Sequence, residues 1–252
     1  TPWVQQAISE TERMRGLEKV FNKNYLNYSL NRFLIKLQKL QLSDGSWPWY
    51  KGMKGSQYIT MRIAYSMKKL DEMPFDHIVQ WNSLYNKAMD YLNAEMTEDY
   101  FELKESSGFG QKKDYLSHNT IMYLYLLESD FEGNDDRQKE ALEFYRYQLK
   151  THIFKKSLKT QALGALVLYD LGEGEFDDLI KSFNERSLYS NELGRYWKAN
   201  DIEYDLRGAL ECQSLLIQAF TLAEKPDRYI DGLKVWLLKQ KQVQGWGPSE
   251  ST

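Results

Sequence analysis

The chain has 252 residues, enough to bury a sizeable core in one large domain or two small ones. Its formal net charge of −3 predicts no basic field for nucleic acid, and no apolar run reaches the roughly 20 residues that span a bilayer. A single cysteine excludes an internal disulfide and a cysteine-based zinc cluster. The aromatic content of 14%, beside only 5 Pro, favours long helices that carry large amphipathic side chains into interfaces.

Hydrophobic residues recur at three- and four-residue spacing along most of the chain, which is typical of helices. A period-two pattern occurs only as a weak hairpin-like stretch at 192–204. We therefore predict one all-α domain over 1–252. Its helices are expected at 10–42, 56–70 with Ser56 as N-cap, 78–96, 115–128, 137–149, 160–171, 176–186, 207–223 and 228–242.

A turn rich in aromatic residues separates the first two predicted helices. Asp44 and Gly45 supply the turn, because Gly tolerates a positive φ and Asp can accept hydrogen bonds from its own backbone. Pro48 prevents an immediate return to helix. The aromatic residues of this turn are predicted to be buried at the junction of the two helices as structural anchors: Trp47, Trp49 and Tyr50.

Two later stretches repeat the combination of Gly and Trp at a helix end. One is Asn191-Glu192-Leu193-Gly194-Arg195-Tyr196-Trp197, and the other is Gln242-Val243-Gln244-Gly245-Trp246-Gly247-Pro248. Trp197 and Trp246 are therefore predicted to be structural turn aromatics as well. Recurrence of one turn at helix ends indicates that the chain repeats a helix pair.

The later helices alternate in character. Those at 115–128, 160–171 and 207–223 are apolar nearly all round, whereas the helices that follow each of them are amphipathic. A helix that is apolar on every side must be surrounded by others, and a striped one lies at the surface. The alternation predicts an α/α-toroid with an inner and an outer ring. The ring is predicted to be incomplete at the C-terminus, because 249–252 resembles the N-cap of a further inner helix.

The segment from Gln41 to Trp47 resembles the turn of α/α-toroid proteins, among them terpene cyclases and prenyltransferases. The wider match resembles the α-helical, thioester-type, complement-like domain of bacterial α2-macroglobulin-like proteins, and it covers most of the chain. It is carried by Thr1-Pro2-Trp3, Glu10-Thr11-Glu12, the extended turn from Asp44 to Met53, the segment from Leu210 to Phe220, and Trp236-Leu237-Leu238-Lys239-Gln240-Lys241-Gln242.

This resemblance implies a fragment of a large multidomain protein of the periplasm or cell envelope that traps and inhibits peptidases. The implied partners are neighbouring domains of the parent protein and peptidases, and no cofactor is expected. In thioester-bearing relatives, a Cys-x-Glu-Gln stretch joins the Cys sulfur to the Gln side chain. Here Leu215 is the third residue after Cys212, so we predict no thioester in this chain and a buried, structural Cys212.

A toroid enzyme, either a polysaccharide lyase or a glycosidase, is the alternative. Its strongest candidates are His118, Asn119 and Tyr123, because some toroid polysaccharide lyases use these residue types as base, charge neutraliser and acid. Glu211 is added as a pocket candidate. Asp135-Asp136 and Asp177-Asp178 stand at predicted helix starts, where capping explains them. We therefore expect no catalysis. A carbohydrate-binding module, with the turn aromatics as a sugar platform, is a further alternative.

Overall fold

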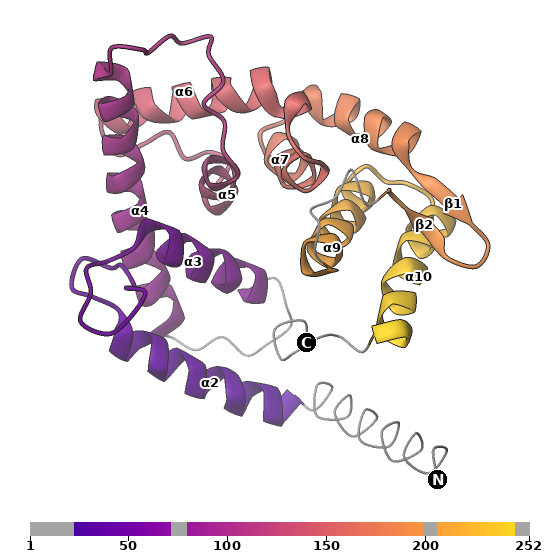
Figure 1. Cartoon of the computed structure of the whole chain (residues 1–252). Coiled ribbons are helices and arrows are strands. Elements are labelled where there is room, and N and C mark those ends of the chain that lie inside the picture. Colours follow the sequence, from indigo (N-terminus) through magenta and orange to yellow (C-terminus); the bar gives the residue numbers. More distant parts are fainter. Residues whose placement is uncertain (1–22, 72–79, 199–205, 245–252) are drawn as a thin grey trace. The chain divides into compact units, whose positions relative to one another are not determined.

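A computed structural model describes residues 23–71, 80–198 and 206–244. These residues form helices and one short β-hairpin, so the prediction of an all-α chain is confirmed (Figure 1). The elements are α2 (Lys23–Leu40), α3 (Gln57–Asp71), α4 (Gln80–Glu105), α5 (His118–Leu126), α6 (Asp136–His152), the 3-10 turn η1 (Ile153–Lys155), α7 (Leu158–Asp170), α8 (Glu175–Arg186), β1 (Leu188–Ser190), β2 (Gly194–Tyr196), α9 (Leu206–Leu222) and α10 (Asp227–Gln244).

Four of the described helices, α3, α5, α6 and α7, begin at a polar side chain that caps them. Ser56 Oγ accepts from Ile59 N at 3.4 Å, which supports the predicted N-cap of α3. Asp135 caps α6 by accepting from Gln138 N, as the acidic pair predicted. Asp177 and Asp178 lie in the first turn of α8, where negative charge complements the helix dipole.

Two predicted helix lengths need correction. The helix expected to end at Met96 continues as α4 to Glu105, because Tyr100 is buried and packs on Phe144 with ring centroids 4.8 Å apart. The helix expected from 115 to 128 is only α5, since Ser117 caps its start and Leu127 is already extended. Tertiary contacts and caps therefore set these ends.

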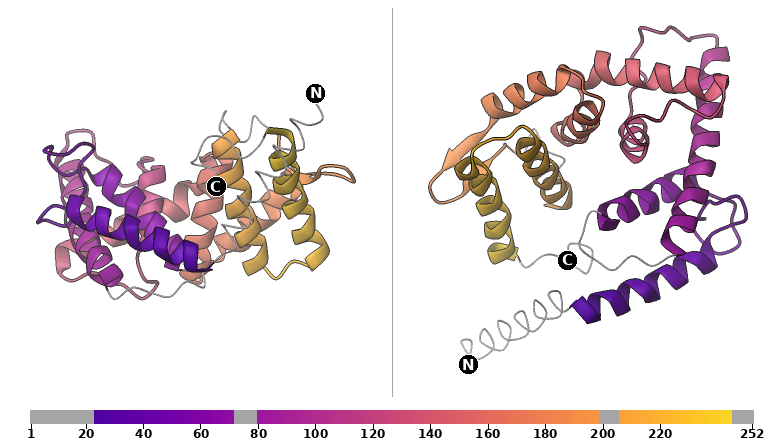
Figure 2. Two further views of the ribbon diagram at one scale, coloured as in Figure 1. Left: turned by 90° about the horizontal axis from the view of Figure 1, so that it is seen from below. Right: turned by 180° about the vertical axis from the view of Figure 1, so that it is seen from behind.

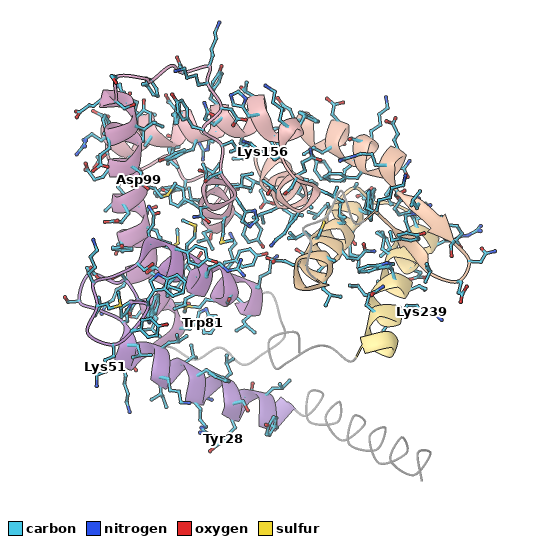
Figure 3. The ribbon with its side chains drawn as sticks, in the orientation of Figure 1. Tyr28, Lys51, Trp81, Asp99, Lys156 and Lys239 are labelled. Atoms are coloured by element: carbon cyan, nitrogen blue, oxygen red, sulfur yellow. The ribbon has the colours of Figure 1, made fainter. Side chains whose placement is uncertain are left out.

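The described chain divides into two compact units, one up to Glu98 and one from Asp99 on. In the first unit, α2, α3 and the first part of α4 enclose a core around Trp81, which Figure 3 labels. The buried members of this core are Leu34, Trp47, Met67, Trp81, Leu84 and Ala88. The prediction of a single domain over 1–252 stays a prediction.

In the second unit, α7 lies beside α5, α8 and α9, as the views of Figures 1 and 2 agree. The side chains from Thr120 to Leu126 in α5 and from Thr160 to Leu168 in α7 are all buried, whereas α6 and α8 each bury one face. Helices α5 to α8 thus alternate, as predicted, between helices buried on all sides and amphipathic helices with one buried face. The helix at 207–223 was predicted to be surrounded by other helices, but α9 has an exposed side that includes Ser214 and Thr221.

A two-stranded hairpin connects α8 to α9. Strands β1 and β2 pair antiparallel, with Tyr189 opposite Arg195, and β2 lies against α10 (Figure 1). The sequence predicted a hairpin at 192–204, but the paired residues begin at Leu188. The strand signal was weak because each strand has only three residues.

Several predictions fall outside the described residues: the start of the first helix at 10–22, the anchor Trp246 and the incomplete ring end at 249–252. Among the helices that the structure describes, none combines the length and the apolar character needed to cross a membrane. The toroidal arrangement also stays a prediction.

Candidate functional site

The turn around Trp47 joins α2, α3 and α4, the helices of the first unit that the structure describes. Trp47 is buried, and its indole Nε1 donates to Leu37 O in α2 at 2.8 Å. Its backbone N donates to Thr60 Oγ1 in α3 at 2.9 Å. The Gln41 side chain extends the link to α4, since its Nε2 donates to Gly45 O and Leu84 O, each at 2.9 Å. The turn is therefore a junction that satisfies its own buried polar groups.

Gly45 allows this turn to lie directly on α4. Its φ is +90°, and a Cβ added there would lie 2.0 Å from Lys87 O. Asp44 holds the next residue, because its Oδ1 accepts from both Ser46 N and Ser46 Oγ. The predicted roles of Asp44 and Gly45 in the turn are thus visible as contacts.

The segment ending at Trp197 uses the same contacts in the second unit. Trp197 is buried, and its Nε1 donates to Phe183 O in α8 at 3.0 Å. Gly194 has a φ of +74°, and a Cβ there would lie 2.2 Å from Gly232 O in α10. Gln213 Nε2 donates to Arg195 O at 2.9 Å and to Leu233 O at 3.1 Å. The combination of Gly and Trp that the sequence repeats at these two helix ends therefore forms similar contacts in both turns.

The prediction that Trp49 and Tyr50 are buried at the helix junction is wrong. Trp49 is 56% exposed and Tyr50 is 74% exposed. Trp49 instead stacks on Tyr58 of α3, with ring centroids 5.7 Å apart and planes 13° from parallel. Trp47 fills the junction, and after Pro48 the chain runs over the surface.

The polar candidates of the second unit lie at the N-terminal turns of α5 and α7. Ser117 caps α5 and Ser157 caps α7, and each hydroxyl accepts from the backbone N of the Thr three residues later. His118 Nδ1 lies 3.3 Å from Thr160 Oγ1, which joins the two helix starts. The repeated Ser-x-x-Thr pattern was a sequence signal for this pairing that the sequence analysis did not use.

Glu211 belongs to the neighbouring α9 and forms an ion pair across the helices. Its Oε2 lies 2.9 Å from Lys159 Nζ of α7, and both side chains are largely buried. His118 and Glu211 are thus each bonded to adjacent residues of α7, Thr160 and Lys159. Sequence reasoning missed Lys159, because its partner is 52 residues away along the chain.

Tyr123 does not join this polar group. It is buried on the side of α5 near α6, where its ring meets Tyr145 edge-on at 6.2 Å. Burial raises the pKa of Tyr123 above its ordinary value, and the Gln138 hydrogen bond and Arg146 charge offset this only partly. Since His118 instead contacts α7, the proposed lyase trio does not converge in the described structure. Asn119 is half-buried at the start of α5.

A second polar cluster, which the sequence analysis did not single out, lies at the loop before α5. Lys156 Nζ contacts Asp114 Oδ1 at 2.7 Å, and Leu116 N donates to the same oxygen at 3.1 Å. Burial acts to raise the pKa of Asp114, but the two hydrogen bonds and the charges of Lys156 and His152 outweigh it and lower this pKa. The buried Gln148 bonds three backbone groups of this loop.

Two of the hollows lined by described residues are open to solvent. One of about 280 Å³ lies beside the Trp47 turn and is lined by Gln38, Gln41, Ser83 and Lys87 among others. An open one of about 410 Å³ lies between the α7–α8 connection and the end of α9. Neither includes His118, Asn119, Tyr123 or Glu211. In the described part of the chain, no three His, Cys, Asp or Glu side chains gather as a metal site would require.

Comparison of the chain with known protein families finds no match, and comparison with curated proteins finds none either.

Proposed function

We propose that this chain is a non-catalytic α/α-toroid domain of a bacterial α2-macroglobulin-like protein of the periplasm or cell envelope. It would contribute to peptidase trapping through contact with neighbouring domains and with the peptidase. The observation that carries the proposal is the repeated Trp turn, because the stretch that resembles this family forms a helix junction that recurs at Trp197.

The helix environments of the second unit also support the proposal. The surrounded helices α5 and α7 alternate along the chain with the one-sided helices α6 and α8. Inner and outer rings need this alternation, since an inner helix contacts other helices on every side. A body of this kind presents its outer helices for contact with other proteins.

The surroundings of the candidate catalytic residues support a structural role for them rather than a catalytic one. Cys212 is fully buried in α9, and its third following residue, Leu215, is buried beside it. Glu211 is bonded to Lys159, while His118 and Tyr123 contact different helices. General acid–base catalysis needs such groups to converge on one substrate.

Peptidase trapping is tested with the natural protein that contains this chain. The protein is incubated with a peptidase, and the cleavage of a large protein substrate is compared with that of a small peptide substrate. Trapping should suppress only the cleavage of the large substrate, because a small peptide still reaches an enclosed active site. Equal rates with and without the protein, for both substrates, would contradict the proposal.

The non-catalytic part is tested on the chain itself. Intact mass should be unchanged by methylamine, and incubation with anionic polysaccharides should yield no unsaturated product. Methylamine opens a thioester by forming an amide at the Gln-derived carbonyl and releasing the cysteine thiol. A methylamide on a glutamine together with a newly titratable Cys212 thiol would therefore establish a thioester. Lyase activity that disappears in His118→Ala would establish the enzyme alternative.

Carbohydrate binding is the second candidate, favoured by the exposed Trp49 stacked on Tyr58. Such a ring face suits the apolar face of a sugar. Titration with oligosaccharides should then change tryptophan fluorescence in the natural sequence and in Tyr189→Ala, an exposed aromatic elsewhere, but not in Trp49→Ala.

A further inference from the structure

The first helical hairpin, α2 and α3, carries a net positive charge because it contains very few acidic residues. Residues 23–71, from the start of α2 to the end of α3, contain nine Lys and Arg and only two acidic residues, Asp44 and Asp71, which gives this segment a formal charge of +7. Because the whole chain carries −3, the remaining residues together carry −10. The low net charge therefore hides a strong separation of charge along the sequence.

Part of this charge lies on one side of α2, opposite the side that enters the core. The outer face of α2 consists of Tyr25, Tyr28, Arg32, Ile35, Lys36 and Lys39, which follow one another at helical spacing and are all exposed. The core side of the same helix is formed by Leu30, Leu34 and Leu37. Figure 3 shows Tyr28 on the side of α2 away from α3.

Cations and rings are paired on this helix. The Arg32 guanidinium lies 5.8 Å from the centre of the Tyr28 ring, and Lys36 Nζ lies 5.9 Å from the centre of the Phe33 ring. Ile35 and Leu40 are 48% and 45% exposed beside them. The surface thus offers positive charge, aromatic rings and aliphatic side chains together.

We propose that the outer face of α2 binds the surface of an anionic lipid bilayer. Lys and Arg are attracted to acidic headgroups, Tyr is suited to the headgroup level, and apolar side chains enter the acyl boundary. Ile35 on this face, and Phe33 and Leu40 at its edge, are exposed apolar side chains that favour lipid over single-stranded nucleic acid, which is held by cations and by stacking on free ring faces. This proposal does not depend on the proposed function.

The test measures co-sedimentation of the whole chain with vesicles of phosphatidylcholine alone and of equal parts phosphatidylcholine and phosphatidylglycerol. Binding only to the anionic vesicles, weakened by high salt, is expected. The triple variant Arg32→Gln, Lys36→Gln, Lys39→Gln should bind about a hundredfold more weakly, since each surface cation contributes about fivefold. Ile35→Ser should weaken vesicle binding less than the triple variant does, and this weakening should also be seen at low salt.

A matched control removes the same charge from the second unit. The exposed Lys155, Lys181 and Lys225 are changed together to Gln, and vesicle binding should be unchanged within about twofold. Circular dichroism checks that each variant keeps its helices. The proposal is overturned by an equal loss in both triple variants, by equal binding to both vesicles, or by binding to a single-stranded oligonucleotide without vesicle binding.

Discussion

The turn at Trp47 and the hairpin that ends at Trp197 make the same contacts with different backbones. In each, the indole donates to a carbonyl of the preceding helix, and a Gly with positive φ lies against a carbonyl of a later helix. In each, a Gln side chain bridges a turn carbonyl and a carbonyl of that later helix. The first turn contains no strand, whereas the second contains β1 and β2.

The two regions also differ in how the Trp meets the next helix. Trp47 reaches α3 through its backbone hydrogen bond to Thr60, while the Trp197 ring stacks on Phe220 of α9 at 6.2 Å. The comparison teaches that a buried Trp with a bonded indole defines the junction. The backbone that delivers the Trp can vary.

The largest effect is expected from removing either Trp. Trp47→Ala and Trp197→Ala should each lower the free energy of unfolding by about 3–5 kcal/mol, as large-to-small core changes do. The exposed Trp49→Ala should cost about 0.5 kcal/mol or less. Urea denaturation measures all three. If replacing either buried Trp lowers the free energy of unfolding no more than Trp49→Ala does, the two turns are not equivalent.

The next effect concerns the close approach of glycine to a helix. Gly45→Ala should cost about 2–4 kcal/mol, because it adds a clash with Lys87 O to the strain of a positive φ. Gly52 has the same φ but open space around it, so Gly52→Ala should cost only about 1–2 kcal/mol. If thermal or urea denaturation shows equal losses of stability for Gly45→Ala and Gly52→Ala, the close contact of Gly45 with α4 does not contribute.

Smaller effects are expected from the bridging glutamines. Gln213→Leu should cost about 1–3 kcal/mol, because two buried carbonyls lose their donor. Gln41→Leu should cost less, since Gln41 is only half-buried and water can replace it. Denaturation of both variants checks this order, and a larger loss for Gln41 would reverse the comparison.

The smallest effect is expected outside both turns, at Asp114 and Lys156. The folded-state pKa of Asp114 lies below its ordinary value, so its contribution is present above the unfolded pKa of about 3.9 and is lost as pH falls through the folded pKa. Lys156→Gln should cost about 1 kcal/mol or less near neutral pH and reduce the loss of stability below about pH 4. The exposed Lys155→Gln is the control, and an unchanged acid profile in Lys156→Gln would contradict this assignment.

The sequence was sufficient for the helices and for the Trp47 turn, because helical periodicity, Ser and Asp caps, and Asp-Gly turns act locally. It could not place Trp49 and Tyr50, since an aromatic turn residue is equally compatible with burial and exposure until the junction is filled by Trp47. The extension of α4 depended on Tyr100 meeting Phe144, a contact between residues distant in sequence.

The candidate site was predictable only in part. His118 and Glu211 were identified by residue type, but their partners Thr160 and Lys159 lie on another helix. The buried glutamines gave no pattern of their own, because a Gln amide is also common on surfaces. The charge of the first hairpin was readable from the sequence, yet the net charge concealed it.

Hydrogen exchange of the indole protons tests the equivalence of the two Trp junctions most directly. Spectra of the whole chain in deuterated buffer are compared with those of Trp47→Phe, Trp197→Phe and Trp49→Phe to assign the signals. The indole protons of Trp47 and Trp197 should both exchange slowly, because each is buried and bonded to a helix carbonyl, while that of Trp49 should exchange at once. Exchange of Trp197 as fast as that of Trp49 would contradict the account.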